Sequence, residues 1–155
     1  MNSRIHLAAG LCLLLVALSS AAPARGAGPR AIASRTFSLS DTGRLHLTSK
    51  HKFTLNEQGY ASGTISGAIY IHLNVVSTNH VTAEVNIYPS GGSITGYANA
   101  SYHPSGSVAT FNGTMYLARG TGRYSRARGS GLSFTGTIKR ENDAVTVHVN
   151  GRMSA

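Results

Sequence analysis

The sequence offers few side chains that could act as a general acid or base. Its carboxylates number five: Asp41, Glu57, Glu84, Glu141 and Asp143. Glu57, Glu141 and Asp143 lie in turn-like segments, "NEQG" and "REND", so we expect them to be solvated. Glu84 instead lies in a run that alternates apolar and polar residues. An acidic residue within a strand can act as a proton donor or acceptor if its side of the strand faces the interior of the domain. Glu84 is therefore a candidate catalytic residue.

Two further candidates accompany Glu84. Tyr70 and His72 occupy the polar phase of the preceding alternating run, "YIHLNVV". No Gly-x-Ser-x-Gly nucleophile motif is present, and the single cysteine, Cys12, lies in an apolar N-terminal segment. The histidines beyond that segment have no metal-ligand spacing: His46, His51, His72, His80, His103 and His148. We therefore expect no metal site and no cofactor.

A second kind of chemistry is suggested by the arginines of "RGTGRYSRARGSG", residues 119–131. Four of them fall close together without an intervening acid: Arg119, Arg123, Arg126 and Arg128. Guanidinium groups bind phosphate, sulfate or carboxylate, so the segment is a candidate anion-binding loop. The alternative is a solvated, charged rim of a connector.

The overall charge is consistent with an acidic partner. The chain has 14 Lys and Arg against 5 Asp and Glu, a formal net charge of +9. Such an excess favours association with acidic polymers or surfaces, although it also serves solubility alone. Nucleic acid is not the expected partner, because the chain has no Trp and its aromatic residues are spread out rather than grouped into stacking platforms.

The elements that must position these residues are strands. In "HVTAEVNIY" and "DAVTVHVNG" apolar and polar residues alternate strictly, as in strands buried on one face, and no window has the period of an amphipathic helix. Turn residues separate the runs every ten to fifteen residues. The predicted strands are 35–40, 43–55, 60–76, 80–88, 93–102, 107–118, 131–139 and 144–152. Which of the two faces lines the interior is left open.

This pattern predicts a single all-β domain over residues 35–155, an antiparallel up-and-down barrel of eight strands, with a β-sandwich as the alternative. Glycine-threonine pairs recur within three strand segments, "ASGTISG", "TFNGTMY" and "SFTGTIK". Glycine weakens a strand unless the backbone bends or meets another surface closely there. We therefore interpret these glycines as structural.

The N-terminus is predicted to be a targeting segment rather than part of the domain. Arg4 precedes the apolar run "IHLAAGLCLLLVAL", and small residues follow it, which is the pattern of a secretory signal peptide over residues 1–24. Residues 25–34 form a predicted flexible leader. We expect the protein to be secreted or periplasmic, without a transmembrane segment in the mature chain. An uncleaved N-terminal anchor is the alternative.

The segment "GTGRYSRARG" also carries a family resemblance. It resembles the Gly-Thr-Gly-x-aromatic-x-x-Ala-x-Gly connector of the dirigent and allene oxide cyclase-like β-barrel superfamily. The matching positions are Gly120, Thr121, Gly122, Tyr124, Ala127 and Gly129. The resemblance implies an eight-stranded barrel with an apolar lumen, often oligomeric, in a family whose members guide the cyclisation or coupling of apolar intermediates. It assigns no catalytic residue to this sequence.

Three functions follow as hypotheses. The first is a barrel that binds a small apolar ligand in its lumen without catalysis. The second is a cyclase-like or dirigent-like role, which needs a polar group inside the lumen; Glu84, His72 and Tyr70 are the candidates. The third is a surface-interaction protein that binds acidic polymers through the arginine-rich loop. A homo-oligomer is compatible with each.

Overall fold

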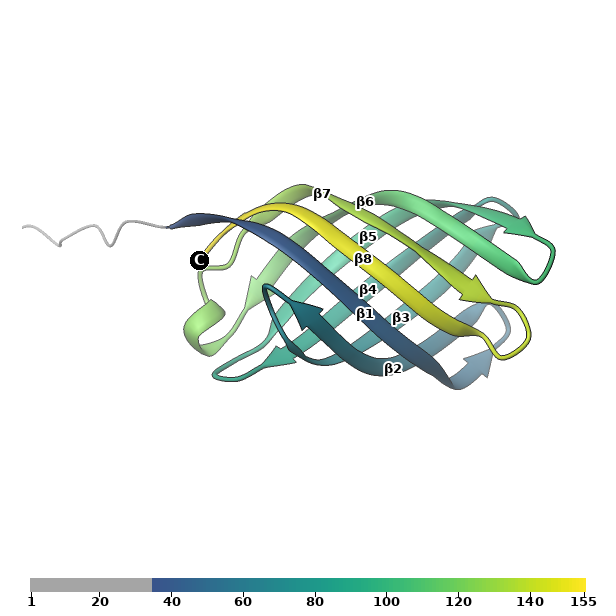
Figure 1. Ribbon diagram of the computed structural model, residues 1–155, viewed down its shortest axis with the longest axis horizontal. Helices are drawn as coiled ribbons and strands as arrows, with labels where there is room; N and C mark the ends of the chain where they lie inside the picture. Colours follow the sequence, from purple (N-terminus) through teal and green to yellow (C-terminus); the bar gives the residue numbers. More distant parts are fainter. Residues whose placement is uncertain (1–34) are drawn as a thin grey trace, which may run out of the picture. The chain divides into compact units, whose positions relative to one another are not determined.

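The computed structural model describes residues 35–155, which form eight antiparallel strands closed into a barrel (Figure 1). The predicted signal peptide and leader lie outside the described residues. The strands are β1 (Thr36–His51), β2 (Thr54–Gly63), β3 (Gly67–Ser77), β4 (His80–Pro89), β5 (Ile94–Ser105), β6 (Val108–Gly120), β7 (Gly129–Lys139) and β8 (Ala144–Ser154). A single 3₁₀ turn, η1 (Gly122–Tyr124), precedes β7. The predicted barrel is confirmed, and the sandwich alternative is wrong.

The barrel is closed by the pairing of its first and last strands. β1 and β8 run antiparallel in register from Thr36 opposite Ser154 to Leu45 opposite Val145. Each other strand pairs with its neighbours in sequence, so the order is a simple meander. Closure leaves neither β1 nor β8 as an edge strand. In residues 35–155 no helix is long and apolar enough to cross a membrane.

The two ends of the barrel are built differently (Figure 1). At the hairpin end, short turns join β1 to β2, β3 to β4, β5 to β6 and β7 to β8. At the opposite end lie the other three connections, including η1, together with the C-terminus.

The apolar face of the strands lines the interior. The residues of β4 that alternate inward, Val81, Ala83, Val85 and Ile87, are all buried. One continuous cluster of aliphatic side chains fills the barrel, and Phe111 and Phe134 stack inside it with ring centroids 5.2 Å apart. An eight-stranded barrel is just wide enough for side chains to fill it. The polar phase of each strand therefore faces outward.

The first three strands differ from those predicted. β1 is continuous through the predicted break at residues 41–42, and the chain turns at Lys52, whose φ is 53°. The predicted turn at residues 56–59 lies inside β2. Its glycine, Gly59, is required by the approach of β1, since a Cβ there would overlap the Arg44 carbonyl oxygen.

The 120–129 connector is a tight corner that ends β6. Gly122, the first residue of the 3₁₀ turn η1, takes a φ of 56°. Ala127 is fully buried and the half-buried Tyr124 packs against the core, so both cover the end of the barrel. The segment is anchored to the β4–β5 turn, because Thr121 N donates to the Ser93 carbonyl oxygen at 2.9 Å.

The repeated strand glycines mark close approaches. A side chain at Gly136 would overlap the Thr146 carbonyl oxygen and the Phe111 ring. A Cβ at Gly113 would likewise overlap the Ala100 backbone. The structural interpretation is therefore confirmed for the strand glycines Gly113 and Gly136.

We predict that Gly136→Ala lowers the free energy of unfolding by about 1–3 kcal/mol, because the added methyl group overpacks the barrel. Gly129→Ala is the matched control, since a Cβ there meets its nearest atoms at an ordinary 3.4 Å. It should change stability by less than about 0.5 kcal/mol. Urea unfolding of both variants measures the difference, and an equal effect at the two positions would contradict the overpacking argument.

Candidate functional site at the hairpin end of the barrel

The three residues proposed for lumen catalysis lie on the outer surface of the barrel. Glu84 accepts a hydrogen bond from Asn86 Nδ2 at 3.1 Å. His72 lies opposite Glu84 on β3 and hydrogen-bonds to Asn56. Tyr70 is 41% exposed and packs edge-on against Tyr88. None of the three provides the polar group inside the lumen that the cyclase-like hypothesis requires.

The lumen does contain a carboxyl group that was expected elsewhere. Glu57 is only 2% exposed, so the expectation that it is solvated is wrong. It points inward from β2, in the same phase as Leu55 and Ala61. Neither of its carboxylate oxygens has a hydrogen-bond partner among the described residues. An unpartnered buried carboxyl is energetically costly, which makes it a candidate for a functional group.

The surroundings of Glu57 favour its protonated form and so raise its pKa. Burial is the main cause, because it disfavours the charged form, and the negative charge of Asp143 adds to it. The positive charge of Lys50 acts in the opposite direction. Together these effects raise the pKa of Glu57 to about 7.

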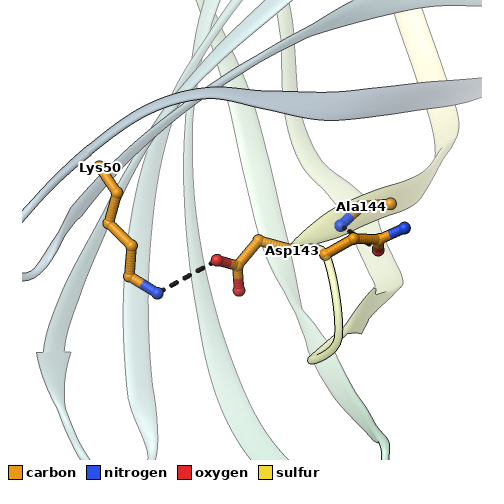
Figure 2. Close-up of polar contacts among 4 residues, drawn as sticks. Lys50, Asp143 and Ala144 are labelled. Carbon is orange, nitrogen blue, oxygen red and sulfur yellow. Dashed lines mark hydrogen bonds and ion pairs between the residues drawn. The ribbon is translucent and has the colours of Figure 1, made fainter.

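The hairpin end of the barrel opens as a small hollow of about 200 Å³, which we call the hairpin hollow. Glu57 does not line it, but Lys50 and Asp143, whose charges act on Glu57, do. Lys50 and Asp143 line it and form an ion pair of 3.1 Å between the end of β1 and the β7–β8 turn (Figure 2). Its remaining lining residues are Lys52, Phe53, Leu55, Leu73, Val75, Tyr102 and Ile138.

Local sequence explains the position of Asp143. This residue has a φ of 53°, and the preceding Asn142 accepts a hydrogen bond from Ala144 N at 3.1 Å, an arrangement typical of an Asx turn. The turn directs the Asp143 carboxylate towards Lys50 (Figure 2). Asp143 is therefore partly buried in an ion pair, unlike the solvated residue that its turn sequence suggested.

The hairpin hollow combines an apolar wall with few polar groups. Phe53 is 71% exposed at its rim, and an adjoining hollow of about 320 Å³ continues from Phe53 and Val75 to Val76. A concave apolar surface with a few placed polar groups is the usual form of a small-molecule site. Among the described residues, no three His, Cys, Asp or Glu side chains are grouped to hold a metal ion.

The second buried acid has a structural role. Asp41 Oδ1 accepts a hydrogen bond from Ile65 N at 2.8 Å and so anchors the β2–β3 turn. Burial raises the pKa of Asp41, against the opposing effect of backbone hydrogen bonds from Ile65 and Thr64.

The four candidate arginines do not converge on one site. Arg123 lies over the ring of Tyr124, 5.5 Å from its centroid. Arg128 donates to the Ala127 carbonyl oxygen at 2.7 Å and lines a surface hollow that neither Arg119 nor Arg126 lines. The sequence did not single out Arg152, which lines the same hollow as Arg128.

We predict that Glu57→Gln changes the pH dependence of stability. A carboxyl whose pKa is raised by folding binds its proton more tightly in the folded state, so the wild type loses stability as pH rises from the ordinary pKa of 4.5 to about 7. The variant lacks this loss and should be more stable than the wild type at about pH 8 but not at about pH 4. Glu84→Gln, on the outer surface, is the control. Urea unfolding across this range tests the prediction; parallel curves for wild type and Glu57→Gln would contradict it.

No family model, curated protein or solved structure matches this chain. The resemblance of the 120–129 connector to the dirigent and allene oxide cyclase-like superfamily therefore stays a prediction. The function has to be argued from the geometry and chemistry of the sites themselves.

Proposed function

We propose that this protein binds a small, mainly apolar molecule at the hairpin end of its barrel. The observation that carries the proposal is the buried, unpartnered carboxyl group of Glu57, on which the charges of Lys50 and Asp143 in the wall of the hairpin hollow act. A ligand that donates a hydrogen bond to this carboxyl would offset part of the cost of burying it.

The position of the hollow refines the hypothesis of a lumen ligand. Aliphatic and aromatic side chains already occupy the interior, so the proposed site is the mouth of the lumen rather than its centre. At about 200 Å³ the hollow is smaller than the pocket of a typical drug-sized ligand. We infer a ligand with a compact apolar body and one O–H or N–H donor directed at Glu57.

The apolar wall supports an apolar body. Leu55, Leu73 and Ile138 are buried at the base of the hollow, and Phe53 exposes a large apolar ring at its rim. Removing such apolar surface from water contributes about 25 cal/mol per Å² to the free energy of binding. Lys50 and Asp143 neutralise each other, so the rim presents no net charge from this pair to an incoming ligand.

A second candidate function, proton transfer, rests on the same residue. A carboxyl group with a pKa of about 7 exchanges its proton readily at neutral pH, as a general acid or base must. In a cyclase-like or dirigent-like role Glu57 would therefore replace Glu84 as the acting group. We propose either role for an exported protein, in keeping with the signal-like residues 1–24.

We predict that 2-naphthol, a compact bicyclic compound with one O–H donor, binds the wild type more tightly than naphthalene does. Glu57→Leu should weaken 2-naphthol binding about tenfold, because a hydrogen bond to a charged acceptor is lost. Naphthalene binding should be unchanged. Fluorescence titration measures both affinities.

Glu84→Leu is the matched control, since it makes the same substitution on the outer surface and should leave both affinities unchanged. Glu57→Leu is expected to fold, because it removes an unpartnered buried carboxyl. Equal affinity of the wild type for the two probes would refute the proposed site. Exchange of the C1 hydrogen of 2-naphthol for deuterium in D₂O that is faster with wild type than with Glu57→Gln would favour the proton-transfer function.

A further inference from the structure

The outer surface carries a second hollow where the β7–β8 ladder is interrupted. The two strands pair from Lys139 opposite Ala144 to Ser133 opposite Asn150, and pairing resumes only at an isolated bridge between Arg128 and Ser154. In the interruption, Gly131 takes a φ of 64° and β7 bulges opposite β6. Bulges commonly redirect side chains next to binding sites.

The resulting hollow, which we call the arginine hollow, has a volume of about 580 Å³. Its lining residues are Thr36, Tyr116, Leu117, Arg128, Gly129, Ser130, Arg152, Met153 and Ser154. Two arginines and four hydroxyl-bearing side chains thus line it, and no Asp or Glu does. The ion pair found among residues 35–155 is that of Lys50 with Asp143, at the hairpin end, so neither arginine is neutralised by a carboxylate. Arginine is well suited to binding carboxylate or sulfate groups in this setting.

A polar groove with one carboxylate, that of Glu84, adjoins the arginine hollow. It has a volume of about 400 Å³, and we call it the tyrosine groove. Two rows of directly opposed outer residues on β3, β4, β5 and β6 form most of it. They are His72–Glu84–Tyr97–Tyr116 and Asn74–Thr82–Asn99–Thr114. No Lys or Arg lines this groove.

Tyr116 joins the two hollows, because it lines both. It is 52% exposed and lies beside Tyr97, with ring centroids 5.7 Å apart. The faces of aromatic rings carry partial negative charge, which attracts the weakly positive C–H groups of a sugar ring. The amide and hydroxyl groups of Asn74, Asn99 and Thr114 can both donate to and accept from sugar hydroxyls.

From this arrangement we propose that the outer surface binds an acidic polysaccharide in which uronic acid residues alternate with neutral sugars. A neutral sugar lies in the tyrosine groove, stacked on Tyr97 or Tyr116. The carboxylate of the adjacent uronic acid is bound by Arg128 and Arg152. This site is independent of the ligand proposed for the hairpin hollow.

The charge distribution distinguishes this ligand from other polyanions. A nucleic acid or a densely sulfated glycan carries a charge on nearly every unit, so it would place some of them beside the Glu84 carboxylate in the tyrosine groove. Like charges in such proximity disfavour binding. A chain with neutral units between its acidic ones avoids this repulsion while still reaching the arginines.

The test uses the full chain and a hyaluronan hexasaccharide, in which glucuronic acid alternates with N-acetylglucosamine. Affinity is measured by isothermal titration calorimetry. We expect Arg128→Gln/Arg152→Gln to weaken binding at least about tenfold, because two charge-assisted contacts are lost. Tyr116→Ala should weaken it about fivefold through the loss of stacking. Binding to the wild type should fall with added salt.

Each variant has a matched control. Arg123→Gln/Arg126→Gln removes the same charge from arginines that do not line the arginine hollow, and Tyr60→Ala removes an exposed tyrosine that lines neither hollow. Both controls should bind within about twofold of the wild type if the site is specific. Chitohexaose, which is neutral, should bind more weakly than the hyaluronan hexasaccharide.

Several results would overturn the proposal. The first is failure of the wild type to bind the hyaluronan hexasaccharide. The second is an equal loss of affinity in the two arginine pairs, which would indicate attraction by net charge alone. The third is tighter binding of a heparin hexasaccharide or of single-stranded oligothymidylate, which would identify a general polyanion or nucleic-acid surface.

Discussion

Pairing of β1 with β8 is the constraint on which the rest of the structure depends. It joins the two ends of the domain, removes both sheet edges and fixes the register of the closed barrel. In a closed sheet a shift of one residue would exchange the inner and outer faces of a strand, which the apolar interior forbids. The barrel lacks disulfides among its described residues, so its stability rests on this ladder and on the packed interior. Closure therefore divides the residues of each strand into an inner and an outer set.

Against that background Glu57 is the residue that conflicts with its surroundings. The register of β2 with β1 and β3 places it opposite Leu47 and Ile71, so it must face inward. Lys50 offsets part of the cost electrostatically, whereas Asp143 increases it. Leucine would satisfy the fold at this position without such a cost. Residues that satisfy the fold poorly tend to mark functional sites, and here Leu55, two residues earlier on the same strand, lines an opening in the barrel.

Much of the fold was predictable because alternation is a local signal. It gave the all-β class, the number of strands and the bounds of β4 to β8 within a few residues. The β1–β2 turn was missed, because it uses Lys52 with a positive φ rather than glycine or proline. Glu57 was consequently assigned to a turn. Extending the phase of Leu55 to Glu57 and Ala61 would have placed it inside. Arg128 and Arg152 line the same hollow because Arg128 pairs with Ser154, far away in the sequence. Local alternation of residues cannot predict such a long-range pairing.

The two proposed sites use charge in opposite ways, and the barrel wall makes this possible. Inside the barrel the dielectric constant is low, so a single carboxyl group interacts strongly with a bound ligand, and salt screens this interaction little. Outside, Arg128 and Arg152 are exposed, so each contact is weak and affinity requires several of them along an extended ligand. A compact ligand at the hairpin hollow and a chain across the outer strands therefore need not compete. One closed sheet can hold both because alternate residues of each strand belong to different environments.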